Sequence, residues 1–167
     1  MSVIWPHIAI LAFVTLQRLS ELALARQNTA ALLARGAREV APGHYPLIVA
    51  VHAGWLAALW WLAPGRPIDW WLIGLFVLLQ LARVWVIRTL GPRWTTRIII
   101  LPGAPRIDTG PFRYLSHPNY AVVMAELVLL PLAFGLPHVA MLFFALNALV
   151  LAIRITAENK ALSEANP

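Results

Sequence analysis

Five apolar runs, each about as long as a membrane-spanning helix, limit what this chain can fold into more than any other feature. A helix needs roughly 17 to 25 residues to cross the hydrocarbon core of a bilayer. Runs of that length lie at residues 3–24, 45–63, 69–90, 119–136 and 137–157. Only 12% of the 167 residues are charged, whereas a soluble domain carries roughly 25%. The sequence therefore predicts an all-α integral membrane protein with about five transmembrane helices in one domain, residues 1–167.

The positions of the basic residues predict how these helices are oriented. Lys and Arg gather in the cytoplasmic loops of membrane proteins. Here they concentrate after the first, third and fifth runs, whereas the other two connections together carry one Arg. The residues that decide this count are Arg26, Arg35, Arg38, Arg93, Arg97, Arg106, Arg113 and Lys160. We therefore expect the N-terminus outside the cell and the C-terminus in the cytoplasm.

The net charge of +6 also raises the question of nucleic acid binding. The Arg residues are scattered between apolar runs and form no basic cluster interleaved with aromatic residues, so we expect no nucleic acid partner. Cys is absent, which excludes disulfides and a cysteine nucleophile. His44 and His52 lack a third ligand at helical spacing, so no metal site is predicted.

The connection between the third and fourth runs, residues 91–118, is the least membrane-like part of the chain. Its β-branched stretch 94–101, the turn 102–105 and residues 106–109 together predict a small β-hairpin. The segment that joins the first two runs, residues 25–44, has an amphipathic pattern. That pattern fits either a short helix on the membrane surface or a plain tether, and both interpretations stay open.

His117 and Pro118 mark the start of the fourth run. Pro suits the first position of a helix because that position has no hydrogen bond for an N–H to make. His117 is thereby predicted at the cytoplasmic mouth of the fourth helix. Deeper in the same helix lies Glu126, and because an ionisable group is costly to bury in lipid, we expect it to face a polar cavity or a partner.

Arg154 and Glu158 lie one helical turn apart at the inner end of the fifth run, where they share a face and can pair with each other. The fourth and fifth helices are predicted to form a tight hairpin, so their inner ends are neighbours. The side chains expected to converge there are His117, Tyr120, Arg154 and Glu158. Because ligand pockets favour junctions between helices, we predict a functional site at this place.

Other ionisable residues inside the apolar runs leave a second function open. Arg18 and Glu21 are predicted to pair with each other or with Arg83 or Arg88. If Glu126 and Arg83 instead lined a polar path, the chain would be a non-catalytic small membrane transporter or an assembly protein. That alternative gives no special role to the His-Pro turn.

Two motifs resemble a known family. Residues 110–120 read Gly-Pro-Phe-Arg-Tyr-Leu-Ser-His-Pro-Asn-Tyr, and after an apolar hairpin residues 154–162 read Arg-Ile-Thr-Ala-Glu-Asn-Lys-Ala-Leu. In this order and spacing they resemble the isoprenylcysteine carboxyl methyltransferase family of integral membrane methyltransferases, over residues 88–162. The N-terminal part is similar to the short microbial members that methylate alkylpyrone and alkylresorcinol polyketides, in its Arg18, Glu21, Asn28, Gly36, His44-Tyr45-Pro46 and His52.

The resemblance implies S-adenosylmethionine as the cofactor, bound by residues 91–162 at the cytoplasmic end of the last two helices. It implies a lipophilic acceptor that enters from the membrane beside the three N-terminal helices, residues 1–90. The implied cofactor-binding residues are Arg106, Gly110, Arg113, His117, Pro118 and Tyr120, and the implied catalytic residues are Arg154 and Glu158. Family members often carry Arg where Ser116 stands and a second Glu where Asn159 stands. The first departure leaves Arg106 or Arg113 to supply charge near the carboxylate of the cofactor.

The chemistry of the acceptor stays open between two classes. Methyl transfer from a sulfonium requires chiefly that the acceptor oxygen and the methyl carbon be aligned and that water be excluded. For an isoprenylcysteine-like carboxylate, Arg154 would hold the anion, with Glu158 fixing Arg154 or gripping the cofactor. For a polyketide phenol or enol, a base or an Arg-stabilised oxyanion is required, with partners from the acceptor pocket or the site. The candidates are Glu126, His52 and Glu158.

Overall fold

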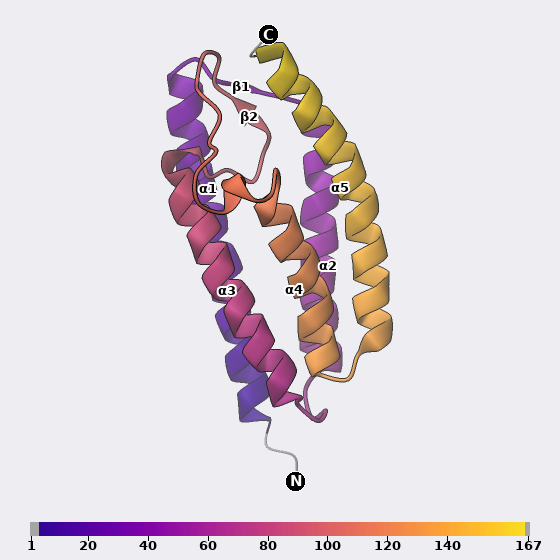
Figure 1. Cartoon of the computed structure of the whole chain (residues 1–167). Helices are drawn as coiled ribbons and strands as arrows, with labels where there is room; N and C mark the ends of the chain where they lie inside the picture. Colours follow the sequence, from indigo (N-terminus) through magenta and orange to yellow (C-terminus); the bar gives the residue numbers. More distant parts are fainter. Residues whose placement is uncertain (1–3, 166–167) are drawn as a thin grey trace.

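The computed structural model describes residues 4–165, which form five α-helices that run up and down a single bundle (Figure 1). The helices are α1 (Trp5–Ala34), α2 (Tyr45–Leu62), α3 (Trp70–Leu90), α4 (Pro118–Ala133) and α5 (Pro137–Ala165). Four of them are long and apolar enough to cross a membrane, and α4 is a shorter apolar helix of 16 residues. The predicted all-α membrane fold is thus confirmed.

Local sequence signals explain where most of these helices begin. Asp69 caps α3, because its carboxylate accepts hydrogen bonds from the backbone N–H groups of Trp71 and Leu72 at 2.9 and 3.1 Å. Pro118 and Pro137 occupy the first positions of α4 and α5, where their missing N–H costs nothing. Residue 3, where the first helix was expected to begin, lies outside the described residues.

Helix α1 is longer than the sequence pattern predicts. We expected it to end at residue 24 and a separate surface helix or tether to follow, but the helix continues without a break to Ala34. Residues 25–34 contain four Ala and no Pro or Gly, so nothing in them stops a helix. The chain turns away only near Gly36, whose φ of +88° suits a residue without a side chain. The separate surface helix is therefore wrong.

The predicted small sheet is present, but its strands come from two different connections. β1 (Arg38–Glu39) lies between α1 and α2, and it pairs antiparallel with β2 (Ile99–Ile100), so that Arg38 is opposite Ile100. The expected hairpin within residues 94–109 is therefore wrong. Residues 106–109, its expected second arm, form no strand, and residues 99–100 pair with β1 instead. The backbone N–H of Val40 extends the pairing with a bond to the carbonyl of Ile98 at 2.9 Å.

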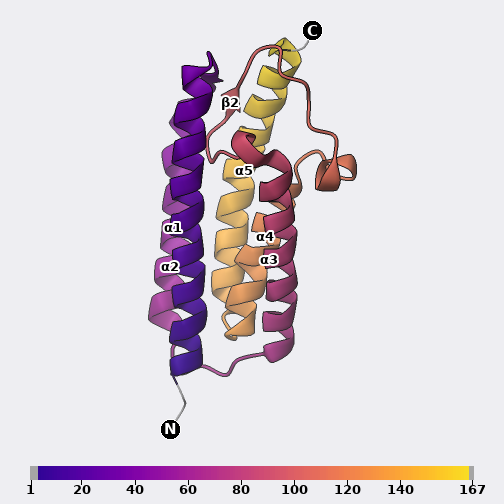
Figure 2. The same cartoon turned by 90° about the vertical axis from the view of Figure 1, so that its left-hand side faces the viewer.

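The helices share one apolar core. α4 packs between α3 and α5, and α2 packs against α5 and α1 (Figure 2). Towards one end of the bundle all five helices, with the α4–α5 turn, contribute to a large apolar cluster that includes Leu11, Trp55, Phe76, Leu127, Phe134 and Phe143. A smaller cluster of Ala25, Val86 and Trp94 lies towards the other end. Between the two clusters, the buried stripes of α1, α3 and α4 carry charged residues.

The basic connections lie together at one end of the bundle. The α1–α2 connection, the long connection from α3 to α4 and the C-terminal part of α5 all gather there (Figure 1). We call this the cavity end, because a cavity lies among these connections. The arrangement agrees with five antiparallel helices whose basic segments share one side, as the charge pattern requires.

Candidate functional site

A cavity of about 640 Å³ lies at the cavity end, under the long α3–α4 connection. This volume falls in the range of pockets that hold small organic ligands. The walls come from residues 93–108 of the connection, from the start of α4 and from the last part of α5. The charged side chains of the lining are Arg93, Arg97, Arg106, Asp108, Arg154 and Glu158. Four cations against two carboxylates give the cavity a positive character.

The four side chains predicted to converge do lie together, and we call them the site cluster: His117, Tyr120, Arg154 and Glu158. Arg154 is only 5% exposed, and two of its guanidinium nitrogens are engaged. Its Nε donates to the Tyr120 hydroxyl at 2.7 Å, and its Nη1 donates to the backbone carbonyl of Thr96 at 2.8 Å. Among the described residues no carboxylate forms an ion pair with Arg154. Its Nη2 is left without a partner among the described residues, and Arg154 lines the cavity.

Tyr120 stands between the two residues expected to be catalytic. Its hydroxyl accepts the bond from Arg154 and donates a short hydrogen bond to Glu158 Oε2. The guanidinium carbon of Arg154 also lies 5.6 Å from the centre of the Tyr120 ring. Arg154 and Glu158 thus share a helical face without pairing directly, because the phenol bridges them.

His117 completes the cluster from the turn before α4. Its ring stacks on Tyr120 with centroids 5.1 Å apart and an angle of 15° between the planes. Its Nε2 lies 3.2 Å from Asn159 Oδ1, and its Nδ1 lies 3.8 Å from Glu158 Oε2. Asn159, which replaces a second Glu often found in the family that the motifs resemble, is therefore a hydrogen-bond partner of His117 in this chain.

The remaining residues expected to bind a cofactor divide into two groups. Pro118, which is buried, and Arg106, which is exposed, line the cavity. Gly110 and Arg113 are not part of its lining. Gly110 instead packs against α3, where a Cβ atom would fall 2.6 Å from Thr89 Oγ1, and its φ is +57°. Its glycine is thus explained by close approach and backbone conformation.

Several contributors to the cavity escaped the sequence analysis, among them Arg93 and Asp108. Trp94 and Arg97 line it, and Thr96 offers its backbone carbonyl to Arg154. The sequence analysis used Arg97 only to predict the orientation in the membrane. The backbone carbonyl of Thr96 could not be predicted, because every residue type has one. For Trp94 the composition of the connection does carry a signal, because a large aromatic residue beside basic ones is typical of a ligand pocket.

An open apolar groove of about 440 Å³ lies beside the cavity, between α4 and α5. It shares His117 and Tyr120 with the cavity, so the same two residues line both spaces. The rest of its lining is apolar and consists of Ala121, Met124, Ala148, Leu151, Ala152 and Ile155. His117 and Tyr120 therefore border both a polar and an apolar space, whereas Arg154 and Glu158 line only the cavity.

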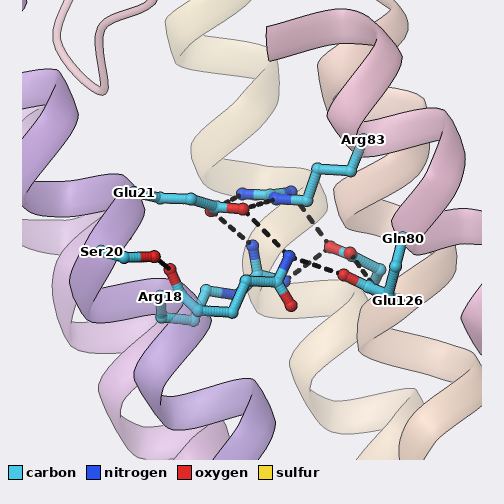
Figure 3. Close-up of polar contacts among 7 residues, drawn as sticks. Arg18, Ser20, Glu21, Gln80, Arg83 and Glu126 are labelled. Carbon is cyan, nitrogen blue, oxygen red and sulfur yellow. Dashed lines mark hydrogen bonds and ion pairs between the residues drawn. The ribbon is translucent and has the colours of Figure 1, made fainter. Parts of the chain in front are cut away.

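A second polar cluster, the charged layer, is buried deeper in the bundle (Figure 3). It consists of Gln17, Arg18, Glu21, Gln80, Arg83 and Glu126. Glu126 is fully buried and receives bonds from Arg18 Nη2 at 2.6 Å, Arg83 Nη1 at 3.1 Å and Gln80 Nε2 at 2.8 Å.

Glu21 is held in the same layer by two Arg residues. Arg83 donates to both of its carboxylate oxygens at 2.5 Å, and Arg18 Nη1 lies 3.3 Å from Oε2. Of the predicted alternatives, in which Arg18 and Glu21 pair with each other or with Arg83 or Arg88, the structure shows two together, because Glu21 pairs with both Arg18 and Arg83. The layer holds two cations and two anions, so it is neutral and joins α1, α3 and α4.

Neither residue expected in an acceptor pocket lines the cavity or the groove. Glu126 faces the partners just described. His52, on α2, holds its Nδ1 2.8 Å from the carbonyl of Ile48 in its own helix. We expected Glu126 to face a polar cavity or a partner, because an ionisable group is costly to bury in lipid, and it faces partners.

Comparison with known proteins places this site in a wider context. The model of the isoprenylcysteine carboxyl methyltransferase (ICMT) family matches residues 72–164. The chain is 38% identical to the uncharacterized protein YpbQ of Bacillus subtilis over 165 residues, which cover 96% of each protein. It is 34% identical to an uncharacterized protein of Haemophilus influenzae over 84 residues, 50% of this chain and 49% of that protein. No solved structure matches.

Proposed function

The chain belongs to the isoprenylcysteine carboxyl methyltransferase family, and from this premise we propose that it transfers a methyl group from S-adenosylmethionine to an oxygen of a lipophilic acceptor. Membership makes it a membrane methyltransferase. One observation carries the finer proposal: the site cluster stands where a polar cavity meets an apolar groove. A water-soluble cofactor and a membrane-soluble acceptor need such a meeting point.

The residues around the cavity fit S-adenosylmethionine. The cofactor has a carboxylate, an ammonium group, a sulfonium centre and an adenosine moiety. Arg106 and Arg93 supply positive charge for the carboxylate, and Asp108 or Glu158 supplies negative charge for the cationic part. The stacked rings of the cluster add an aromatic face, which attracts cations. The volume of about 640 Å³ is sufficient for a ligand of this size.

When bound, S-adenosylmethionine supplies a methyl group that is already activated on sulfur. What the chain must add is alignment and a dry environment. Arg154 is fixed at Nε and Nη1, and its Nη2 makes no hydrogen bond within the described residues. We assign Nη2 to the acceptor oxygen, which it holds and orients.

Glu158 has a role that depends on the acceptor. A carboxylate acceptor has no proton to lose, so Glu158 then serves only to fix Tyr120 and through it Arg154. A phenol or enol must lose a proton, and Glu158 is the carboxylate within the site cluster that can take it. Arg154 would stabilise the negative charge on the acceptor oxygen, whether that oxygen belongs to a carboxylate or to the anion of a phenol or enol.

The same proposal includes the orientation of the chain. Because the basic connections lie at the cavity end, that end faces the cytoplasm, where the cofactor is dissolved. The alternative of a transporter, in which Arg83 and Glu126 line a polar path, gains no support. Both residues are buried in the charged layer and bind each other at 3.1 Å.

The test uses the full chain purified in detergent. Calorimetry with S-adenosylmethionine measures binding, and methyl-labelled cofactor offered with a prenylated cysteine or an alkylpyrone measures transfer by mass spectrometry of the product. We expect binding and one labelled product, whose identity decides between carboxylate and enol. Absence of cofactor binding by a folded sample would refute the proposal.

A further inference from the structure

The hydrogen bond that fixes Arg154 depends on an irregular piece of backbone. The acceptor for Arg154 Nη1 is the carbonyl of Thr96, in residues 94–98 between a short helical turn and β2. A carbonyl in such a segment has no helix or extended sheet to hold it. Its position is set by whatever else the segment contacts.

Those contacts come from the N-terminal half of the chain. The hydroxyl of Tyr45, the first residue of α2, lies 3.2 Å from Thr96 Oγ1 and shares a hydrogen bond with it. The guanidinium carbon of Arg97 lies 4.2 Å from the centre of the Tyr45 ring. Glu39 in β1 then binds Arg97 Nη1 at 2.7 and 3.0 Å.

Further bonds flank this contact on both sides. Asn28 of α1 donates its Nδ2 to the carbonyl of Trp94 at 2.8 Å, and Val40 donates its N–H to the carbonyl of Ile98 at 2.9 Å. Residues 94, 96 and 98 of the segment are therefore each hydrogen-bonded to one of the first 45 residues of the chain. Tyr45 is the central tie, because it touches both Thr96 and its neighbour Arg97.

We propose that Tyr45 is a positioning residue for Arg154, which it holds through the backbone of Thr96. The inference rests on the proposed function, since it concerns the group assigned to the acceptor oxygen. It makes the start of α2 part of the site, although α2 lies outside residues 72–164, the part that matches the family model. Tyr45 does not touch the reacting groups and does not line the cavity.

The decisive variant is Tyr45→Phe, which keeps the ring under Arg97 and removes only the hydroxyl. A guanidinium that is misplaced slightly binds the cofactor as before but orients the acceptor poorly. We expect kcat to fall about tenfold, because the loss of one orienting contact raises the activation barrier by roughly the amount that corresponds to a tenfold change in rate. The Kd for S-adenosylmethionine should stay within about twofold. Thr96→Val should reproduce the effect, because it removes the other partner of the same hydrogen bond.

The double variant Tyr45→Phe/Thr96→Val separates positioning from general destabilisation. If one hydrogen bond carries the effect, the double variant is no slower than either single variant. Tyr114→Phe is the matched control, since Tyr114 is exposed and lines neither the cavity nor the groove. It should leave kcat and cofactor affinity unchanged.

Three outcomes would overturn the inference. The first is full activity in Tyr45→Phe, and the second is additive losses in the double variant. The third is a fall in cofactor affinity and melting temperature that parallels the fall in kcat, which indicates a structural role only. A wild-type chain that binds no cofactor would instead refute the proposed function, and the role of Tyr45 would fall with it.

Discussion

The charged layer and the site cluster both contain Arg and Glu, yet they satisfy these charges differently. In the layer, each Arg binds two carboxylates and both oxygens of Glu126 are taken. In the cluster, Arg154 is buried to a similar degree but is held by a phenol and a backbone carbonyl. The layer uses its charges to join helices, whereas the cluster leaves a cation available to a ligand.

This difference shows how to interpret an ionisable residue inside a membrane protein. Burial alone does not mark Glu126 as functional, because its partners neutralise it within the bundle. The informative property is an incomplete set of partners at a residue that also lines a cavity, as at Arg154. Mutations should therefore affect stability in one region and activity in the other.

The largest effect is expected from Arg154→Ala. Removing the cation to which we assign the acceptor oxygen should lower kcat by about 10²-fold to 10³-fold, the range found when one preorganised donor to an oxyanion is lost. The melting temperature in detergent should change little, because no buried carboxylate loses its partner. Transfer assays and thermal unfolding of the same samples give both numbers, and a variant that retains normal turnover would contradict the assigned role.

Glu126→Gln should show the opposite pattern. The variant leaves Arg18 and Arg83 with only Glu21 between them, and an uncompensated buried charge costs about 3–5 kcal/mol of stability. Denaturant unfolding in detergent measures the loss. Glu158→Gln serves as the control in the other cluster, where a partly exposed carboxylate should cost far less. Equal losses of stability in the two variants would contradict the proposed difference between the charged layer and the site cluster.

A smaller effect is expected from Tyr120→Phe. The variant keeps the ring that stacks on His117 and removes the hydroxyl that bridges Arg154 and Glu158. We expect kcat to fall about tenfold, because Arg154 loses the hydrogen bond at Nε that helps to orient it. We also expect the Kd for S-adenosylmethionine to rise by up to about tenfold, because Glu158 loses the hydrogen bond that holds it beside the cofactor site, and a hydrogen bond to a charged group contributes about 1.5 kcal/mol. Calorimetry gives this value directly. A loss of turnover as large as that of Arg154→Ala would mean that the phenol takes part in the chemistry.

The smallest effect is expected from His117→Phe. An aromatic ring remains to stack on Tyr120, and the hydrogen bond to Asn159 and the longer contact with Glu158 are lost. A neutral hydrogen bond contributes about 0.5–1.5 kcal/mol, so cofactor affinity should fall by less than about tenfold. If affinity instead disappears in calorimetry, His117 contacts the cofactor through its nitrogens.

The lengths of the apolar runs and the positions of Pro and polar residues between them predict much of this fold. The apolar runs indicate the five helices, and the prolines before α4 and α5 mark their starts. The hairpin of α4 and α5 then brings Tyr120, Arg154 and Glu158 together. These features are local in sequence, or they follow from helices that are adjacent in the chain.

What could not be predicted depends on contacts between distant segments. The partner of β2 is a strand about sixty residues earlier, and two-residue strands carry no pattern of their own. The bond from Arg154 to Thr96 uses a backbone carbonyl, which every residue type offers equally. For Glu126 the sequence indicates a buried face, but the rotation of α4 relative to α1 decides that Arg18 reaches it.

The short length of α4 has a consequence for the space above its first turn. Sixteen residues span about 24 Å at 1.5 Å per residue, whereas α5 has 29 residues and continues well past the start of α4 (Figure 1). Helix α4 packs between α3 and α5, so its first turn lies recessed among longer neighbours. The room left there is where the cavity lies, lined by His117, Tyr120 and the last part of α5. A longer α4 would fill that room with its own backbone.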